Sequence, residues 1–163
     1  MNALKYILTL VIMSVTLTSC RAQRDLSELS AVKGVETVYV GKSMLRLAGA
    51  AAGNSLKTPG FDGQKLLNKL SSIEIVTSDQ LEACKKVNKL LKNLDLTKRL
   101  ETLTEITDDE DHVIISGDID TITNVVKKVV LHVNEPGEVT VIVLSGNIPM
   151  SMIEEALSGA SKD

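Results

Sequence analysis

The chain contains few side chains that could carry out chemistry, and the two histidines are the first to consider. His112 and His132 each lie in a segment rich in β-branched residues. If these segments pair as neighbouring strands, the imidazoles face each other and could share a transition metal, with Asp109 or Asp111 as a third ligand. The alternative is that both are solvent-facing strand residues. Because two ligands do not make a site, we expect no metal and no other cofactor.

Cys84 is the other candidate for catalysis. Leu81, Cys84, Val87 and Leu91 are three or four residues apart, so they lie on one face of a predicted helix. This spacing predicts that Cys84 is a small buried side chain. A nucleophilic cysteine would instead need an activating histidine or cation at an accessible position. The chain also lacks the Gly-x-Ser-x-Gly elbow and the His-Glu-x-x-His zinc motif. We therefore expect a protein that is not an enzyme.

Two further patterns resemble ligand sites and fail on inspection. Gly41-Lys42-Ser43 ends like a phosphate-binding loop, but Glu36 occupies the place of the required first glycine and its carboxylate would repel phosphate. The acidic run from Asp108 to Asp111 could suggest calcium, but its acids are adjacent and the central glycine of a calcium loop is missing. We expect no nucleotide, and we expect the run to form an acidic turn between strands.

Composition excludes another class of partner. The 163 residues include 18 Lys+Arg and 21 Asp+Glu, for a formal net charge of −3, so the basic surface that binds nucleic acid is missing. The chain has one Phe, two Tyr and no Trp, too few to build the stacking platform of a single-strand binder. We expect no nucleic-acid partner.

Cys20 follows an apolar segment near the N-terminus. Lys5 precedes the mostly apolar stretch Tyr6–Leu17, which is too short to span a bilayer and is typical of a signal peptide. The residues Leu17-Thr18-Ser19-Cys20 resemble the bacterial lipobox. That resemblance implies cleavage before Cys20 and attachment of diacylglycerol to its sulfur. The alternative is an ordinary secretory signal followed by a cysteine by chance.

A lipidated Cys20 would make the bilayer itself a partner, because two or more acyl chains anchor a protein stably. The polar segment Arg21–Arg24 contains no acidic cluster. We therefore expect a lipid-anchored protein of the cell membrane or outer membrane that faces the periplasm, with an envelope protein as a further partner.

The remaining sequence predicts one α+β domain. We expect a signal peptide at 1–19, a lipidated tether at 20–31, a single domain at 32–158 and a tail at 159–163. Two early strand–helix segments precede four strands and a short terminal helix. The last four strands should form an antiparallel meander because their connections are too short for crossovers. The expected strands cover residues 34–40, 73–77, 100–107, 112–117, 125–134 and 138–146, and the expected helices cover 43–53, 62–70, 79–92 and 150–157.

Turns centred near residues 122 and 136 give the meander a register. One face, the predicted core, then contains the pairs Val113–Leu131, Ile115–Val129, Val139–Val133 and Val141–Leu131. The other face contains the apolar row Ile114, Val130 and Ile142 among polar neighbours. This row either lies under a helix of the same chain or forms an exposed strip for a protein partner or a hydrophobic ligand.

Three segments carry a family resemblance. Val32–Leu45, Leu66–Ser78 and Gly137–Gly146 resemble the lipoprotein family named domain of unknown function 4252, found mainly in Bacteroidota. These segments are strand and turn patterns, not catalytic motifs. The resemblance therefore implies an envelope lipoprotein and assigns no reaction, ligand or catalytic residue.

Together these observations predict a membrane-anchored lipoprotein with a non-enzymatic binding or structural role in the bacterial cell envelope. The alternative is a carrier of a lipid or other hydrophobic ligand on the face of the C-terminal meander. A pocket lined by the sheet would favour the carrier. A flat exposed strip would favour a protein partner.

Overall fold

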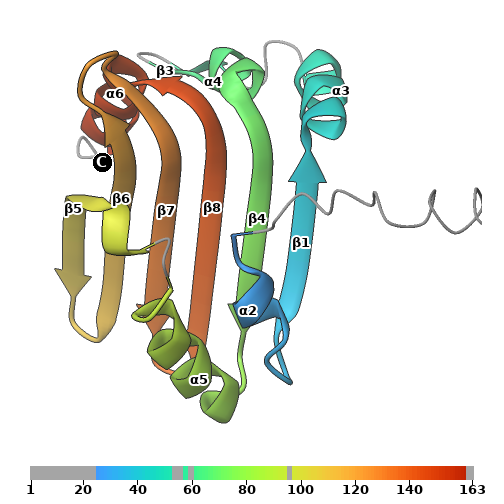
Figure 1. Cartoon of the computed structure of the whole chain (residues 1–163), viewed down its shortest axis with the longest axis vertical. Coiled ribbons are helices and arrows are strands. Elements are labelled where there is room, and N and C mark those ends of the chain that lie inside the picture. The colour runs from blue at the N-terminus through green and yellow to red at the C-terminus, as the bar shows by residue number, and fades with distance from the viewer. Residues whose placement is uncertain (1–24, 53–56, 59–60, 95–96, 161–163) are drawn as a thin grey trace, which may run out of the picture.

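The computed structural model describes residues 25–52, 57–58, 61–94 and 97–160 (Figure 1). The predicted signal peptide, Cys20 and residues 161–163 of the predicted tail lie outside the described residues.

A six-stranded antiparallel sheet forms the centre of the molecule, with strand order β1-β4-β8-β7-β6-β5. Its strands are rich in Val, Ile and Thr, whose branched side chains favour the pleated conformation. The strands are β1 (Glu36–Gly41), β4 (Leu70–Ser78), β5 (Glu101–Asp108), β6 (Asp111–Asp120), β7 (Val125–Glu135) and β8 (Glu138–Pro149), and a separate small pair is formed by β2 (Lys57–Thr58) and β3 (Phe61–Asp62).

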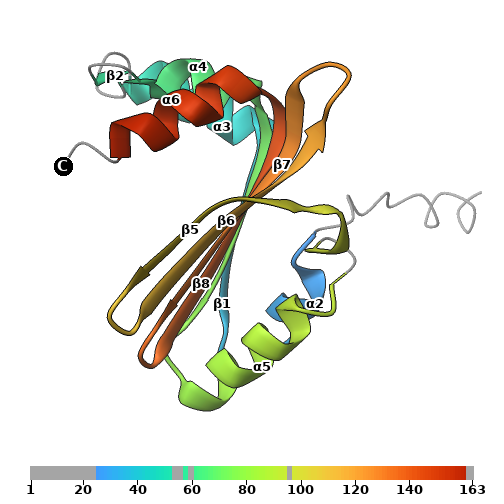
Figure 2. The same cartoon turned by 90° about the vertical axis from the view of Figure 1, so that its left-hand side faces the viewer.

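Helices cover the two faces of the sheet at opposite ends (Figure 2). The α5 face, which includes Val76, Val130 and Val141, packs against α2 and α5. The α6 face, which includes Val129 and Leu144, packs against α3, α4 and α6. The helices are α2 (Ser27–Ser30), α3 (Lys42–Ala52), α4 (Gly63–Lys69), α5 (Leu81–Leu91) and α6 (Met150–Ala160), with a 3-10 turn η2 at Thr97–Arg99.

Each face therefore has its own hydrophobic core. Side chains alternate between the faces along every strand, so one strand supplies both cores. On β7, for example, Val130 belongs to the cluster with Val87 of α5, whereas Val129 belongs to the cluster with Ile153 of α6. Each helical layer covers only one end of its face, and the other end has no described α-helix over it.

The predicted α+β class is confirmed. The strands and helices expected from the sequence are present, with boundaries shifted by a few residues. The four C-terminal strands are neighbours in the sheet, and β4 and β1 continue the same sheet beyond β8. The sheet is larger than the predicted meander because both early strands join its edge.

Both predicted registers of the meander are wrong. Between β6 and β7 the error is two residues, since Val113 lies opposite Val133 and Ile115 opposite Leu131, and an even shift keeps each side chain on its face. Between β7 and β8 the error is one residue. Val139 lies opposite Asn134, not opposite Val133. Glu135 pairs with Glu138, which leaves Pro136-Gly137 as a two-residue turn, and Gly137 has the positive φ of 87° that a type II turn requires at this position. A shift of one residue moves every side chain of β8 to the opposite face.

This shift removes the predicted interaction strip. Ile114 and Val130 lie on the α5 face, whereas Ile142 lies on the α6 face. Val130 is 4% exposed and belongs to the core under α5. The prediction of a strip formed by these three residues is therefore wrong.

The segment predicted as the end of a tether is part of the domain. Leu26 and Leu29 are buried in the core under α5. The buried carboxylate of Glu74 accepts hydrogen bonds from the backbone N–H groups of Asp25 (3.2 Å) and Leu26 (3.0 Å), and Lys128 forms an ion pair with Asp25. The two leucines are three residues apart, a helical spacing within an otherwise polar stretch. The domain begins by residue 25, not at residue 32.

Candidate functional site

A pocket of about 580 Å³ lies on the α5 face, between α5 and strands β5, β6 and β7. It forms because α5 packs mainly over β8 and β4 and meets β7 through Val130 and Asn134, so β5 and β6 extend beyond the helix (Figure 1). The residues that line it are Asn88, Leu91, Lys92, Leu100, Thr102, His112, Ile114, Ser116, Val130, His132 and Asn134.

The lining is apolar in part and polar in part. Its strand residues come from alternate positions, because only every second side chain of a strand faces α5. Leu91, Leu100, Ile114 and Val130 supply the apolar surface. The polar groups are hydroxyls, amides and imidazoles, joined by the ammonium of Lys92. No carboxylate is found among the described residues that line the pocket.

A short hydrogen-bond chain crosses the pocket from helix to sheet. The side-chain amide of Asn88 donates to Oδ1 of Asn134 (2.6 Å), and Oδ1 of Asn88 lies 2.8 Å from Nε2 of His132. Because an amide oxygen can only accept, Nε2 of His132 is the donor. In the neutral imidazole the other nitrogen, Nδ1, is then an acceptor.

His132 is held in its neutral form. Burial lowers the pKa of His132 below its ordinary value of 6.5, and the neighbouring His112 and Lys92 lower the pKa further. Desolvation and nearby positive charge both disfavour the imidazolium. His112 is more open to solvent, and its Nε2 lies 2.6 Å from Oε1 of Glu105 on β5. At neutral pH the pocket therefore contains a neutral imidazole.

The two histidines share the pocket but do not form the predicted cross-strand pair. His112 lies opposite Asn134, and His132 lies opposite Ile114, so the imidazoles are diagonal neighbours with separate hydrogen-bond partners. No cluster of three or more His, Cys, Asp or Glu side chains that could hold a metal ion occurs among the described residues.

The other motifs form structural elements. The acidic run makes the β5–β6 turn, with Asp108 opposite Asp111, as predicted. Gly41 ends strand β1, and the next two residues begin α3 without a phosphate loop between them. Cys84 is buried, as predicted, and its thiol donates to the carbonyls of Ser78 (3.3 Å) and Gly137 (3.5 Å), not to the pocket.

Most of the polar pocket residues, unlike the two histidines, were not predicted from the sequence. Asn88 had a detectable signal, because it lies four residues after Cys84 on the otherwise apolar inner face of α5. An amide at such a position needs a polar partner in the fold. The identity of that partner, Asn134, depends on how α5 packs across β7, which local spacing does not specify.

These features define the class of the protein: an α+β domain built on one large antiparallel sheet, with helices on both faces and a ligand-sized pocket beside α5. The chain belongs to the family described as a domain of unknown function (DUF4252), whose model matches residues 30–156. The matched segment includes all six strands of the main sheet and the whole pocket. The comparisons found no match to a curated protein or to a solved structure. Among the described residues, no helix is both long and apolar enough to cross a bilayer.

Proposed function

We propose that this protein is a lipid-anchored, non-enzymatic binding protein of the bacterial cell envelope, and that the pocket beside α5 holds its ligand. The observation that carries the proposal is the pocket itself. Its volume of about 580 Å³ lies in the range typical of sites for small organic ligands, and its mixed lining suits a molecule with apolar and polar ends. The lipobox at Cys20 supports the anchor and the periplasm-facing location.

The lining favours an amphiphile with an anionic head group. Leu91, Ile114 and Val130 can contact an apolar body, while Lys92 supplies a positive charge. With no carboxylate among the described lining residues, an anionic head group meets no like charge inside the pocket. The pocket lies on strands of the meander, so the proposal is a specific form of the carrier hypothesis.

Benzenesulfonate and benzylammonium test this proposal, because they share a ring and carry opposite charges. We expect the full chain, in phosphatidylcholine nanodiscs, to bind benzenesulfonate at least tenfold more tightly in calorimetric titrations corrected for empty nanodiscs. Ile114→Asp should weaken that binding at least tenfold, since it places a carboxylate in the pocket. Equal affinity for both probes would contradict the anionic ligand.

Ile122→Asp is the matched control for the pocket variant. Ile122 is exposed in the connection between β6 and β7 and does not line the pocket. The same substitution there should leave benzenesulfonate binding unchanged. If the two variants bind alike, the pocket is not the binding site.

The proposed anchor predicts different behaviour for the two cysteines of the chain. Cys20→Ser should abolish incorporation of labelled palmitate and leave the uncleaved precursor, visible by intact mass and gel mobility. Cys84→Ser should be processed and labelled like the native chain, since Cys84 lies in the core. Normal cleavage and membrane retention of Cys20→Ser would refute lipidation at this position.

A further inference from the structure

A second surface lies on the opposite side of the sheet from the pocket. On the α6 face, the half next to the β5–β6 and β7–β8 turns has no described helix over it (Figure 2). Each of the six strands contributes one apolar side chain there, and none of these belongs to either core cluster. We call this set the apolar band; it consists of Val38, Ile75, Ile142, Val133, Val113 and Ile106.

The pairing register carries the band across the sheet in two rows, joined by a diagonal step between β8 and β7. Ile142 lies opposite Leu131, and Val133 is two residues further along β7 on the same face. Val38 lies opposite Ile75, which lies opposite Ile142. Val133 lies opposite Val113, which lies opposite Ile106. The two edge residues are the most open, with Val38 53% and Ile106 54% exposed, and the four between them are partly exposed. A contiguous apolar surface of this kind is typical of an interaction site.

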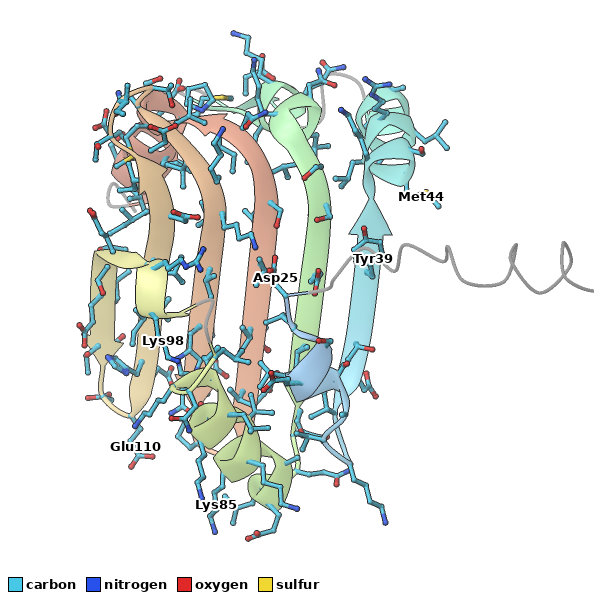
Figure 3. The ribbon with its side chains drawn as sticks, viewed as in Figure 1. Asp25, Tyr39, Met44, Lys85, Lys98 and Glu110 are labelled. Atoms are coloured by element: carbon cyan, nitrogen blue, oxygen red, sulfur yellow. The ribbon has the colours of Figure 1, made fainter. Side chains whose placement is uncertain are left out.

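Carboxylates border the band at the end of the sheet. Glu36, Asp108, Asp111, Glu135 and Glu138 are exposed and lie on the same face as the band, at or near the strand ends. The segments of the six strands that build this half contain no Lys or Arg: residues 36–40, 73–78, 104–108, 111–115, 131–135 and 138–142. Glu110 marks this end of the molecule in Figure 3, and Lys85 at the same end belongs to α5, on the other face.

We propose that the apolar band docks a protein surface that is itself apolar and bordered by Lys or Arg. Apolar contact at the centre with complementary charge at the rim is the usual arrangement of a specific interface. The acidic border disfavours an anionic bilayer, which attracts basic segments. A second copy of this chain would bring another acidic border and no basic residue from its own band. This surface is separate from the pocket, and the proposal goes beyond ligand binding.

A pair of amphipathic helical peptides provides the test. One peptide has a leucine face bordered by lysines, and the other has the same leucines bordered by glutamates. We expect the full chain in phosphatidylcholine nanodiscs to bind the lysine peptide at least tenfold more tightly, by fluorescence anisotropy corrected for empty nanodiscs. Added salt should weaken this binding, because exposed charges are screened. Equal binding of both peptides would contradict the charge argument.

Two exposed isoleucines give matched variants. Ile106→Lys places a positive charge in the band and should weaken binding of the lysine peptide at least tenfold, whereas Ile122→Lys, outside the band, should have no effect. Glu135→Gln combined with Glu138→Gln should weaken binding several-fold and flatten its salt dependence. Because these side chains are exposed, none of the variants is expected to unfold the protein.

Three results would overturn the proposal. Native affinity of Ile106→Lys for the lysine peptide would show that the band is not the docking site. Self-association of the native chain that Ile106→Lys abolishes would identify a second copy as the occupant. Binding of the chain to phosphatidylglycerol vesicles that Ile106→Lys alters and Ile122→Lys does not would identify a lipid surface instead.

Discussion

Leu29→Ala is expected to lower the free energy of unfolding by about 2–5 kcal/mol, since the substitution removes buried methyl groups and leaves a cavity. Leu29 is 0% exposed and packs in the core under α5, in the same cluster as Leu26 and Val87. The helix that carries it, α2, has four residues, too few to be stable without tertiary contacts. The variant should therefore release the N-terminal segment from the sheet as well as weaken the core.

Urea denaturation of the full chain followed by circular dichroism measures this effect. Leu47→Ala is the matched control: Leu47 is 65% exposed on α3, so its truncation should change the free energy of unfolding by no more than about 0.5 kcal/mol. Hydrogen exchange should show faster exchange of the Leu26 amide in Leu29→Ala, because that amide is bonded to Glu74 only while the segment is docked. Equal midpoints for both leucine variants would show that the segment is not part of the core.

Gly146→Ala is the second substitution with a large expected effect, about 3 kcal/mol of lost stability. An added Cβ would lie 2.3 Å from the carbonyl oxygen of Lys69 and 2.9 Å from Cα of Leu70. Both are backbone atoms at the junction of α4 and β4, where the chain leaves the helix and begins to pair with β8. They cannot move aside as the end of a flexible side chain could, so the pairing of β4 with β8 must open.

Thermal unfolding compares this variant with Gly41→Ala. At Gly41 the nearest atoms to an added Cβ are those of the Tyr39 ring, at 3.6 and 3.8 Å, which is an ordinary contact distance. For a domain of this size, 3 kcal/mol corresponds to a decrease in Tm of roughly 6–12 °C. Gly41→Ala should melt close to the native temperature. If the two variants melt together, the close approach at Gly146 does not constrain the sheet.

The pocket and the apolar band lie on opposite faces of the same sheet, and this arrangement lets each be tested without the other. Ile114 faces α5 and lines the pocket, whereas Ile106 faces away from α5 and belongs to the band. A change at one position leaves the other surface in place. Failure of the ligand proposal would therefore leave the docking proposal intact, and the reverse also holds.

Local sequence determined the kinds of element and their order. Runs of Val, Ile and Thr such as Val125–Glu135 and Glu138–Pro149 became long strands, and the short acidic connection between β5 and β6 became a tight turn. The helical spacing around Cys84 correctly predicted a buried thiol. These features depend on neighbours within a few residues, which is the range over which propensity and periodicity act.

Tertiary structure alone decided what covers each face of the sheet, whereas the register of β8 depends on the geometry of one local turn. The Pro136-Gly137 turn shifted β8 by one residue and moved Ile142 away from Val130, because alternation along a strand turns a single step into a change of face. The position of α5 over β8 and β4 left the pocket open beside β5 and β6. Leu26 and Leu29 joined the core because a helix distant in sequence offers them an apolar surface. Such contacts depend on packing between remote segments, which local spacing does not encode.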